Sequence, residues 1–184
     1  MTKSFIPVID QLEKLHQEGF VHGDIRGFNT VFHEDTNQGY LIDFDFGGRA
    51  GEKYYPNGYN KALADGTRQV DNEGKTPPYP IRKWHDWYAL GRLIFEIHEL
   101  EMPEKSSDME MSLQVLVWKE RLNSAFGSLC QDPTPEMIDE LRKFLKKAQE
   151  AGWRVKPSPK YQSELIRVQG GKATIVCATG SPQK

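Results

Sequence analysis

The sequence has few cysteines, no long apolar run and no excess of charge of one sign. Its two cysteines, Cys130 and Cys177, share no motif, so neither a disulfide framework nor a zinc site is indicated. No apolar stretch approaches the roughly 18 residues of a membrane span, and no signal peptide is recognisable. A net charge of −2 gives no electrostatic footprint for nucleic acid or an anionic membrane. We therefore expect an intracellular protein, cytoplasmic or nuclear.

A glycine-rich phosphate-binding loop is also missing. The run Gly47–Gly51 lacks the required spacing, and Gly170-Gly171-Lys172-Ala173 lacks the upstream glycine and the final hydroxyl of a P-loop. We interpret both runs as turns.

What is present predicts one α+β domain that is mainly α-helical. With 184 residues, 38% of them hydrophobic, the chain is large enough to bury a core without staples. Ser4, Asp86 and Thr134 are expected helix N-caps, with Pro135 at the first helical position. Residues 44–83, rich in Gly, Pro, Asn and Asp, are expected to form a long functional or mobile loop. Helices are expected over 4–19, 86–100, 113–126 and 135–152, strands over 30–32 and 40–42, and a terminal hairpin over 164–169 and 172–178.

A short set of acidic and amide residues carries most of the functional information. Asp24 is followed five positions later by Asn29, and a predicted hairpin then ends at Asp43. One aspartate can accept a proton from a substrate hydroxyl, while the amide and the later aspartate can hold magnesium against nucleotide phosphates. The alternative is that all three are ordinary turn residues.

In this order, these residues resemble the catalytic and metal-binding loops of the protein-kinase-like superfamily. The resemblance covers about half the chain, from Ser4 to Leu100, and is closest to the kinase-like domains of Crinkler-type proteins and related fungal kinase-like families. The stretches that carry the closer likeness are Ile42-Asp43-Phe44-Asp45, Tyr55-Pro56-Asn57-Gly58-Tyr59, Asp65-Gly66-Thr67-Arg68 and His85-Asp86-Trp87-Tyr88-Ala89-Leu90.

The resemblance implies a role for each site residue. Asp24, Arg26 and Asn29 would be catalytic, Asp24 as the base and Arg26 as the cation that reaches the transferred phosphoryl group. Asn29, Asp43 and Asp45 would bind ATP and Mg²⁺, with Asp43 as the principal ligand and Asp45 as a second ligand or loop anchor. A rival frame takes Asp45-Phe46-Gly47 as the metal-binding motif, and Arg26 could instead be a surface arginine.

Other matches imply architecture rather than chemistry. His22 and Asp86 would support the catalytic loop, Asp86 by bonding its backbone, while His85 is expected to be a capping or solvent-facing histidine. Gly23 departs from the arginine with which many protein kinases bind a phosphorylated activation loop, so switching by loop phosphorylation loses its electrostatic basis. The same glycine occurs in small-molecule phosphotransferases of the superfamily, which leaves the substrate class open.

The fold implied is a kinase-like C-lobe over residues 1–154, with a small β-hairpin at the catalytic site. Residues 155–184 would be a C-terminal extension with its own hairpin. No glycine-rich loop and no strand lysine precede the site, so the nucleotide-covering N-lobe is expected to be absent.

Three functions fit these features. The first is ATP- and Mg²⁺-dependent phosphoryl transfer to a hydroxyl, such as a Ser or Thr of a protein substrate, with Tyr55 and Tyr59 on the substrate-facing loop. The second is a catalytically weak or inactive kinase-fold remnant that binds a partner protein, and the third is metal-dependent hydrolysis. The partner of this chain could also supply the missing N-lobe.

Overall fold

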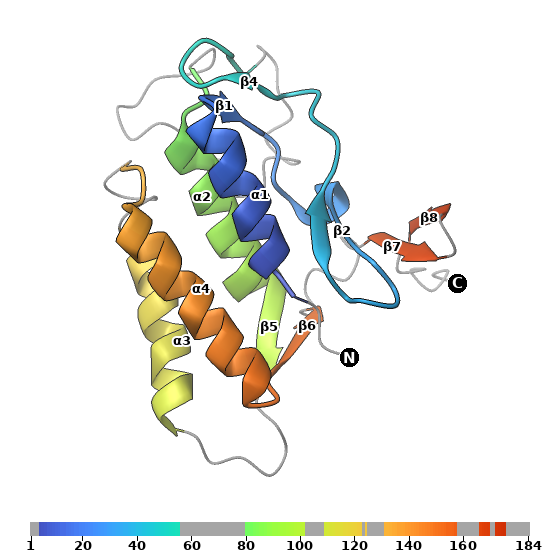
Figure 1. The fold of residues 1–184 in the computed structure, drawn as a ribbon, viewed down its shortest axis with the longest axis vertical. Helices are drawn as coiled ribbons and strands as arrows, with labels where there is room; N and C mark the ends of the chain where they lie inside the picture. The colour runs from blue at the N-terminus through green and yellow to red at the C-terminus, as the bar shows by residue number, and fades with distance from the viewer. Residues whose placement is uncertain are drawn as a thin grey trace, which may run out of the picture.

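The protein has a mixed α+β fold that is mainly helical, as the sequence predicted. The computed structural model describes residues 4–55, 80–101, 109–122, 124, 131–157, 166–169 and 172–175. Figure 1 shows the helices running side by side, with the small strand pairs at their ends and flank. The α-helices are α1 (Ile6–Gln17), α2 (Lys83–Arg92), α3 (Met109–Leu122) and α4 (Pro135–Glu150). The antiparallel pairs are β1 (Phe20–Val21) with β4 (Gly48–Arg49), β2 (Thr30–Phe32) with β3 (Gly39–Leu41), β5 (His98–Glu101) with β6 (Arg154–Pro157), and β7 (Ile166–Gln169) with β8 (Lys172–Ile175).

Helix α1 lies close to its predicted position, but its N-cap was predicted wrongly. Phe5 is at the N-cap and makes no side-chain cap. Ser4 instead uses its backbone to bind the turn between β2 and β3: its N–H donates to Asn37 at 2.8 Å, and its carbonyl accepts from Gly39 at 3.0 Å. The helix ends as predicted, because Gly19 adopts the left-handed conformation, φ +81°, that favours glycine.

Helix α2 is the buried centre of the molecule. Leu90 of α2 is completely buried, and so are Leu93 and Ile94, which directly follow it; each such side chain stabilises the fold by about 1.5–3 kcal/mol. The predicted continuous helix to Leu100 is wrong. The chain passes into a π-helical turn, Leu93–Ile97, and then into β5, which pairs with β6 from beyond α4.

The start of α2 also differs from the prediction. Arg82 is at the N-cap, and its backbone N–H donates to Nδ1 of His85 at 2.8 Å. Asp86 lies inside the first turn and is not the cap. Its carboxylate instead accepts hydrogen bonds from the loop that follows β1.

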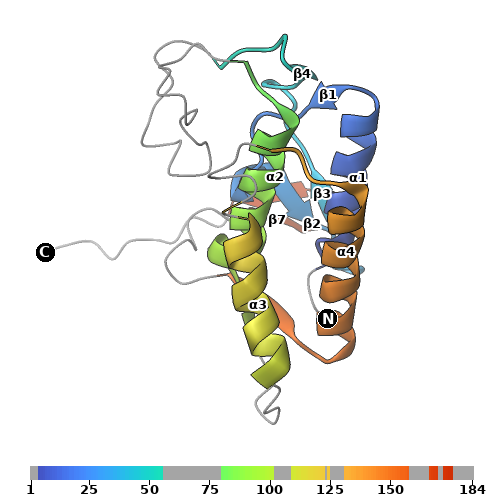
Figure 2. The same cartoon turned by 90° about the vertical axis from the view of Figure 1, so that its left-hand side faces the viewer.

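Helices α3 and α4 pack beside α1 and α2 (Figure 2). The predicted start of α4 is confirmed: Pro135 begins the helix, and the hydroxyl of Thr134 accepts from the N–H of Met137 at 3.3 Å. Helix α3 begins earlier than predicted, at Met109, and the expected end near residue 126 lies outside the described residues.

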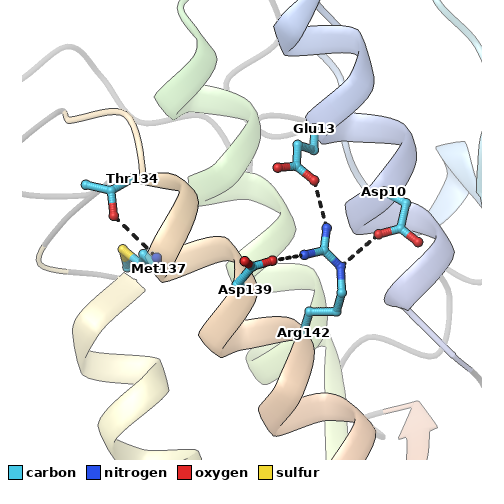
Figure 3. Close-up of polar contacts among 6 residues, drawn as sticks. All are labelled: Asp10, Glu13, Thr134, Met137, Asp139 and Arg142. Carbon is cyan, nitrogen blue, oxygen red and sulfur yellow. Dashed lines mark hydrogen bonds and ion pairs between the residues drawn. The ribbon is translucent and has the colours of Figure 1, made fainter.

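Arg142 joins α4 to α1. Its guanidinium binds Asp10 at 2.9 Å and Glu13 at 2.7 Å, both on α1, and also Asp139 on its own helix (Figure 3). One cation therefore holds three carboxylates at the surface between these two helices.

The two predicted hairpins are present. The second strand of the first hairpin is shifted by one residue, so that Ile42 lies just beyond β3. The terminal hairpin, β7 and β8, is shorter than predicted, and β7 lies against β2 and the 3₁₀ turn η1 (Gly27–Asn29). The pairs β1–β4 and β5–β6 were not predicted, and β6 crosses the expected domain boundary after residue 154. No helix among the described residues is long and apolar enough to cross a membrane.

Candidate functional site

The loop that follows β1 is held by the carboxylate of Asp86. Oδ2 of Asp86 accepts from the backbone N–H of His22 at 2.7 Å, and Oδ1 accepts from the N–H of Gly23 at 2.8 Å. Asp86 is only 1% exposed, and a buried carboxylate is costly unless hydrogen bonds compensate for its lost hydration. Two backbone donors therefore fix the loop onto α2, where the sequence had predicted such a contact.

His22 connects the loop held by Asp86 to Asp24 and Ile42. Its Nδ1 accepts from the backbone N–H of Asp24 at 3.2 Å, and its Nε2 lies 3.1 Å from the carbonyl of Ile42. A carbonyl can only accept, so Nε2 carries the proton and the ring is the neutral Nε2–H tautomer. Burial lowers the pKa of His22 below 6.5, although the carboxylates of Asp86, Asp24 and Asp43 act to raise it.

Gly23 has no room for a side chain. Its φ is +77°, and a Cβ would lie 2.9 Å from the carbonyl oxygen of Phe46 and 3.0 Å from Cδ1 of Ile81. The glycine that departs from the kinase pattern is therefore required by the backbone of this chain. An arginine at this position would be both strained and blocked.

Asp24 and Asn29 form the centre of the site. Nδ2 of Asn29 donates to Oδ2 of Asp24 at 2.8 Å and to its backbone carbonyl at 2.9 Å. Both residues are buried, at 4% and 3% exposure. Since both amide donors face Asp24, the amide oxygen of Asn29 is directed away from it and can accept from a donor or bind a cation. The five-residue spacing is bridged by η1, which folds Asn29 back onto Asp24.

Arg26 lies beside the same carboxylate. Its Nε is 3.3 Å from Oδ2 of Asp24, and its guanidinium lies 5.9 Å from the ring centroid of Phe28. The side chain is one-quarter exposed, so part of it is accessible from solvent. Arg26 is thus a partly exposed arginine that pairs with Asp24, and its role in phosphoryl transfer stays a prediction.

Asp43 reaches the same region from the β3 side. The N–H of Ile42 donates to the carbonyl of Asn29 at 2.9 Å, which places Asp43 one residue beyond a direct contact with the segment that carries Asn29. The ring of Phe44 packs on His22 with centroids 4.6 Å apart. Asp43 itself is exposed and has φ +63°, a conformation that is costly for a residue other than glycine and that clusters at functional sites.

Asp45 occupies the outer part of this turn. Its N–H lies 3.4 Å from Oδ1 of Asp43, and its carbonyl accepts from Nζ of Lys53 at 3.4 Å. The carboxylate of Asp43 therefore orders the turn that carries Asp45. Both carboxylates are exposed, so neither of the two metal-binding frames is excluded by burial.

The site offers oxygen donors of the kind that magnesium prefers. Within the described ranges, no group of three or more His, Cys, Asp or Glu side chains is positioned to hold a metal ion. The donors available are the Asn29 amide oxygen and the exposed carboxylates of Asp43 and Asp45. Magnesium commonly uses one or two carboxylates and completes its octahedron with waters and substrate phosphates.

The sequence also predicted roles for Tyr55 and His85, and the structure contradicts the first and confirms part of the second. Tyr55 is 3% exposed and packs edge-on against His85, so it does not face a substrate as predicted. His85 is buried and caps the first turn of α2, which confirms its capping assignment and not the solvent-facing one. Tyr59 and the Asp65–Arg68 run lie outside the described residues.

One residue of the network was missed. His16 on α1 places Nε2 at 2.9 Å from Oδ2 of Asp86 and is 5% exposed. The only sequence signal was a histidine near the buried stripe of an amphipathic helix, which is more often a packed core residue than part of a site.

Comparisons with protein-family models, with curated proteins and with solved structures gave no match to this chain.

Proposed function

We propose that the chain is a kinase-like phosphotransferase domain that transfers a phosphoryl group from ATP to a hydroxyl with the help of Mg²⁺. The observation that carries the proposal is the buried pair of Asp24 and Asn29, bound at 2.8 Å on a loop clamped by Asp86. Phosphoryl transfer depends almost wholly on positioning and electrostatics, and a clamped carboxylate with an amide beside it meets that requirement.

Each residue has a definite part in the proposed reaction. Asp24 orients the acceptor hydroxyl and takes its proton, and Arg26 offers positive charge to the phosphoryl oxygens. Asn29 and Asp43 bind the metal, with Asp45 as a further oxygen ligand or as the anchor of the turn. Mg²⁺ would supply charge neutralisation for the triphosphate. A protein Ser or Thr is the acceptor that we propose.

The first experiment measures Mg²⁺-dependent ATP binding by calorimetry on the wild type and on Asp43→Asn. Asp35→Asn is a matched control, because Asp35 is an exposed aspartate in the turn between β2 and β3. We expect Mg²⁺-dependent binding that Asp43→Asn weakens at least tenfold and that Asp35→Asn leaves unchanged. Absence of binding by the wild type at millimolar ATP would contradict the proposal.

The second experiment follows transfer of the labelled γ-phosphoryl group from ATP to serine and threonine hydroxyls of an added acceptor protein. Asp24→Ala should lower the rate by about 10²–10⁴-fold, the usual contribution of a positioned general base. An unchanged rate would remove Asp24 from the mechanism, even if ATP still binds.

A second candidate function is a protein-interaction module with the same fold. Leu113, Leu116 and Val117 form an apolar stripe on the outer face of α3, and each is more than half exposed. Exposed apolar side chains at helical spacing are typical of helix-docking surfaces. Loss of partner binding in Leu116→Glu, with ATP binding absent from the wild type, would favour this function.

A further inference from the structure

Helix α3 carries apolar residues on two of its faces. Its inner face places Met111, Trp118 and Leu122 in the core. The three most exposed large hydrophobic side chains of the described residues, at 57–61% exposure, lie on its outer face: Leu113, Leu116 and Val117. The inner face alone satisfies the packing of α3 in this fold, so the outer stripe needs another explanation.

The other long helices do not share this feature. Neither α1 nor α4 has an exposed large hydrophobic residue, and the outward positions of α4 are charged or polar, as at Glu136, Lys143 and Glu150. A single apolar side chain on a surface is ordinary. Three neighbours at helical spacing form a patch of the kind that mediates protein association. The stripe therefore predicts a partner for α3.

The two ends of α3 carry charges of opposite sign. Glu110 lies in its first turn, and Lys119 and Arg121 lie in its last turn. The carboxylate of Glu110 is 3.9 Å from Nζ of Lys147, an exposed contact that holds it only weakly. Two copies of such a helix that run antiparallel place each acidic end beside a basic end, and their macrodipoles then attract each other. The chain itself thus has the charge pattern that suits the stripe.

We propose that two copies of the chain associate through α3, with the two helices antiparallel about a two-fold axis. Such an interface is self-complementary, because each residue meets its counterpart twice. In the register that brings Leu113 of one copy against Leu116 of the other, Glu110 lies opposite Lys119 of the second copy. The apolar centre is then closed at both ends by a pair of opposite charges.

The size of this surface predicts a weak dimer. Helix α3 has 14 residues, so the paired helices meet along about 21 Å. One helix pair is smaller than the roughly 1,200–2,000 Å² of a stable interface, which suggests a dissociation constant of about 10–100 μM. The proposal does not depend on phosphoryl transfer. It rests on the stripe of the second candidate function and gives that stripe one occupant.

The test follows association of the full chain by sedimentation equilibrium, at concentrations from about 5 μM to about 1 mM. Glu110→Lys and Lys119→Glu each place like charges at both symmetry-related contacts. An equimolar mixture of the two variants restores two pairs of opposite charge. Glu18→Lys is the matched control, because Glu18 is an exposed carboxylate at the C-cap of α1.

We expect each reversal in α3 to weaken association of the pure variant about tenfold, since two attractive contacts become repulsive. The mixture should return to within about threefold of the wild-type dissociation constant, and Glu18→Lys should leave that constant unchanged. Leu116→Glu, which places a carboxylate at the apolar centre, should remove association at all concentrations measured.

A wild type that stays monomeric at about 1 mM would overturn the proposal and assign the stripe to a different protein. Association that neither charge reversal weakens would also overturn it, because another surface would then join the copies. Association that both variants lose and that mixing does not restore would contradict the antiparallel register. Since the measurement reads association and not ATP binding, it can succeed or fail independently of the proposed phosphoryl transfer.

Discussion

The side-chain amide of Asn29 binds Asp24 twice, at its carboxylate and at its backbone carbonyl, with distances of 2.8 and 2.9 Å. The amide therefore fixes both the orientation of the Asp24 side chain and the path of its backbone. A residue used in this way tolerates little substitution, even where the replacement has the same size.

Asn29→Asp replaces both donors with acceptors and places a second carboxylate against Asp24 in a buried site. We expect a loss of about 1–3 kcal/mol in the free energy of unfolding, the usual cost of leaving buried polar groups unsatisfied. Urea titration measures it, with Asn37→Asp as a control because Asn37 lies in an exposed turn and should change stability by less than about 0.5 kcal/mol. If the two carboxylates share a cation site, millimolar Mg²⁺ should restore part of the loss. Equal stability of Asn29→Asp and wild type would contradict the pairing.

Gly23→Ala tests the crowded turn above α2. The alanine Cβ would meet a carbonyl oxygen at 2.9 Å, in a backbone conformation with φ +77°. Gly51→Ala is a matched control, since Gly51 has φ +81° but nothing within 4 Å of its added Cβ. Gly51→Ala should lower the free energy of unfolding by about 1 kcal/mol through backbone strain alone. Gly23→Ala should lower it clearly more. Equal losses of unfolding free energy for the two variants in urea titration would show that the turn accommodates the added methyl group without further destabilisation.

Arg142→Met removes the cation that joins α1 to α4 while keeping an apolar stem. Three carboxylates then lose their shared partner (Figure 3). We therefore expect the free energy of unfolding to fall by about 1–2 kcal/mol, more than a single exposed ion pair provides. Arg121→Met is the control, because Glu140 is the single carboxylate with which Arg121 pairs among the described residues, at an exposed site; its guanidinium also lies 4.9 Å from the ring centroid of Trp118. The difference between the two variants should shrink at 1 M NaCl, where the Debye length falls to about 3 Å. A difference that is independent of salt would assign the effect to packing.

His22 predicts a pH dependence of stability. Its pKa in the folded protein is lowered by burial from 6.5, so the unfolded chain binds a proton at a higher pH than the folded protein does. Stability is therefore complete above about pH 6.5 and falls as the pH decreases towards the folded pKa. Urea midpoints between pH 7.5 and pH 5 should fall more steeply in wild type and in the control His33→Gln than in His22→Asn. Identical slopes would show that His22 does not contribute.

Several local sequence signals gave correct predictions, because a few neighbouring residues decide the structure there. Thr134 and Pro135 specify the start of α4 without help from elsewhere, and Gly19 specifies the end of α1 in the same way. The β2–β3 hairpin was also predicted, apart from a shift of one residue. These features depend on capping, on fixed dihedral angles and on turn chemistry, which can be read from short segments.

The wrong predictions concern residues whose role is set by distant partners. Asp86 was predicted to be a helix N-cap. Its carboxylate instead accepts hydrogen bonds from backbone N–H groups more than 60 positions earlier in the chain. The apolar run after Arg92 was predicted to stay helical to Leu100. Its end instead forms β5, which pairs with β6, a strand that follows α3 and α4 in the sequence. Tyr55 looked like a loop residue and is buried against Ile81 and Val21. Such contacts arise only when the chain has folded.

The candidate site shows the same division. The five-residue spacing of Asp24 and Asn29 predicted a shared site, and the two side chains are in contact. The convergence of Asp43 with them stays a prediction. The role of His16 was not predictable, since a lone histidine on a helix has no pattern that distinguishes packing from hydrogen bonding to Asp86.

The backbone at Gly23 also limits how this site can evolve. Because any β-carbon there would meet Phe46 and Ile81, a phosphate-sensing arginine cannot be acquired by one codon change at this position. The turn would have to be rebuilt first, at the expense of the clamp beneath it. Natural variants that gain control of this loop should therefore first change the backbone path at Phe46, whose carbonyl oxygen lies 2.9 Å from such a β-carbon and is present whatever side chain stands there.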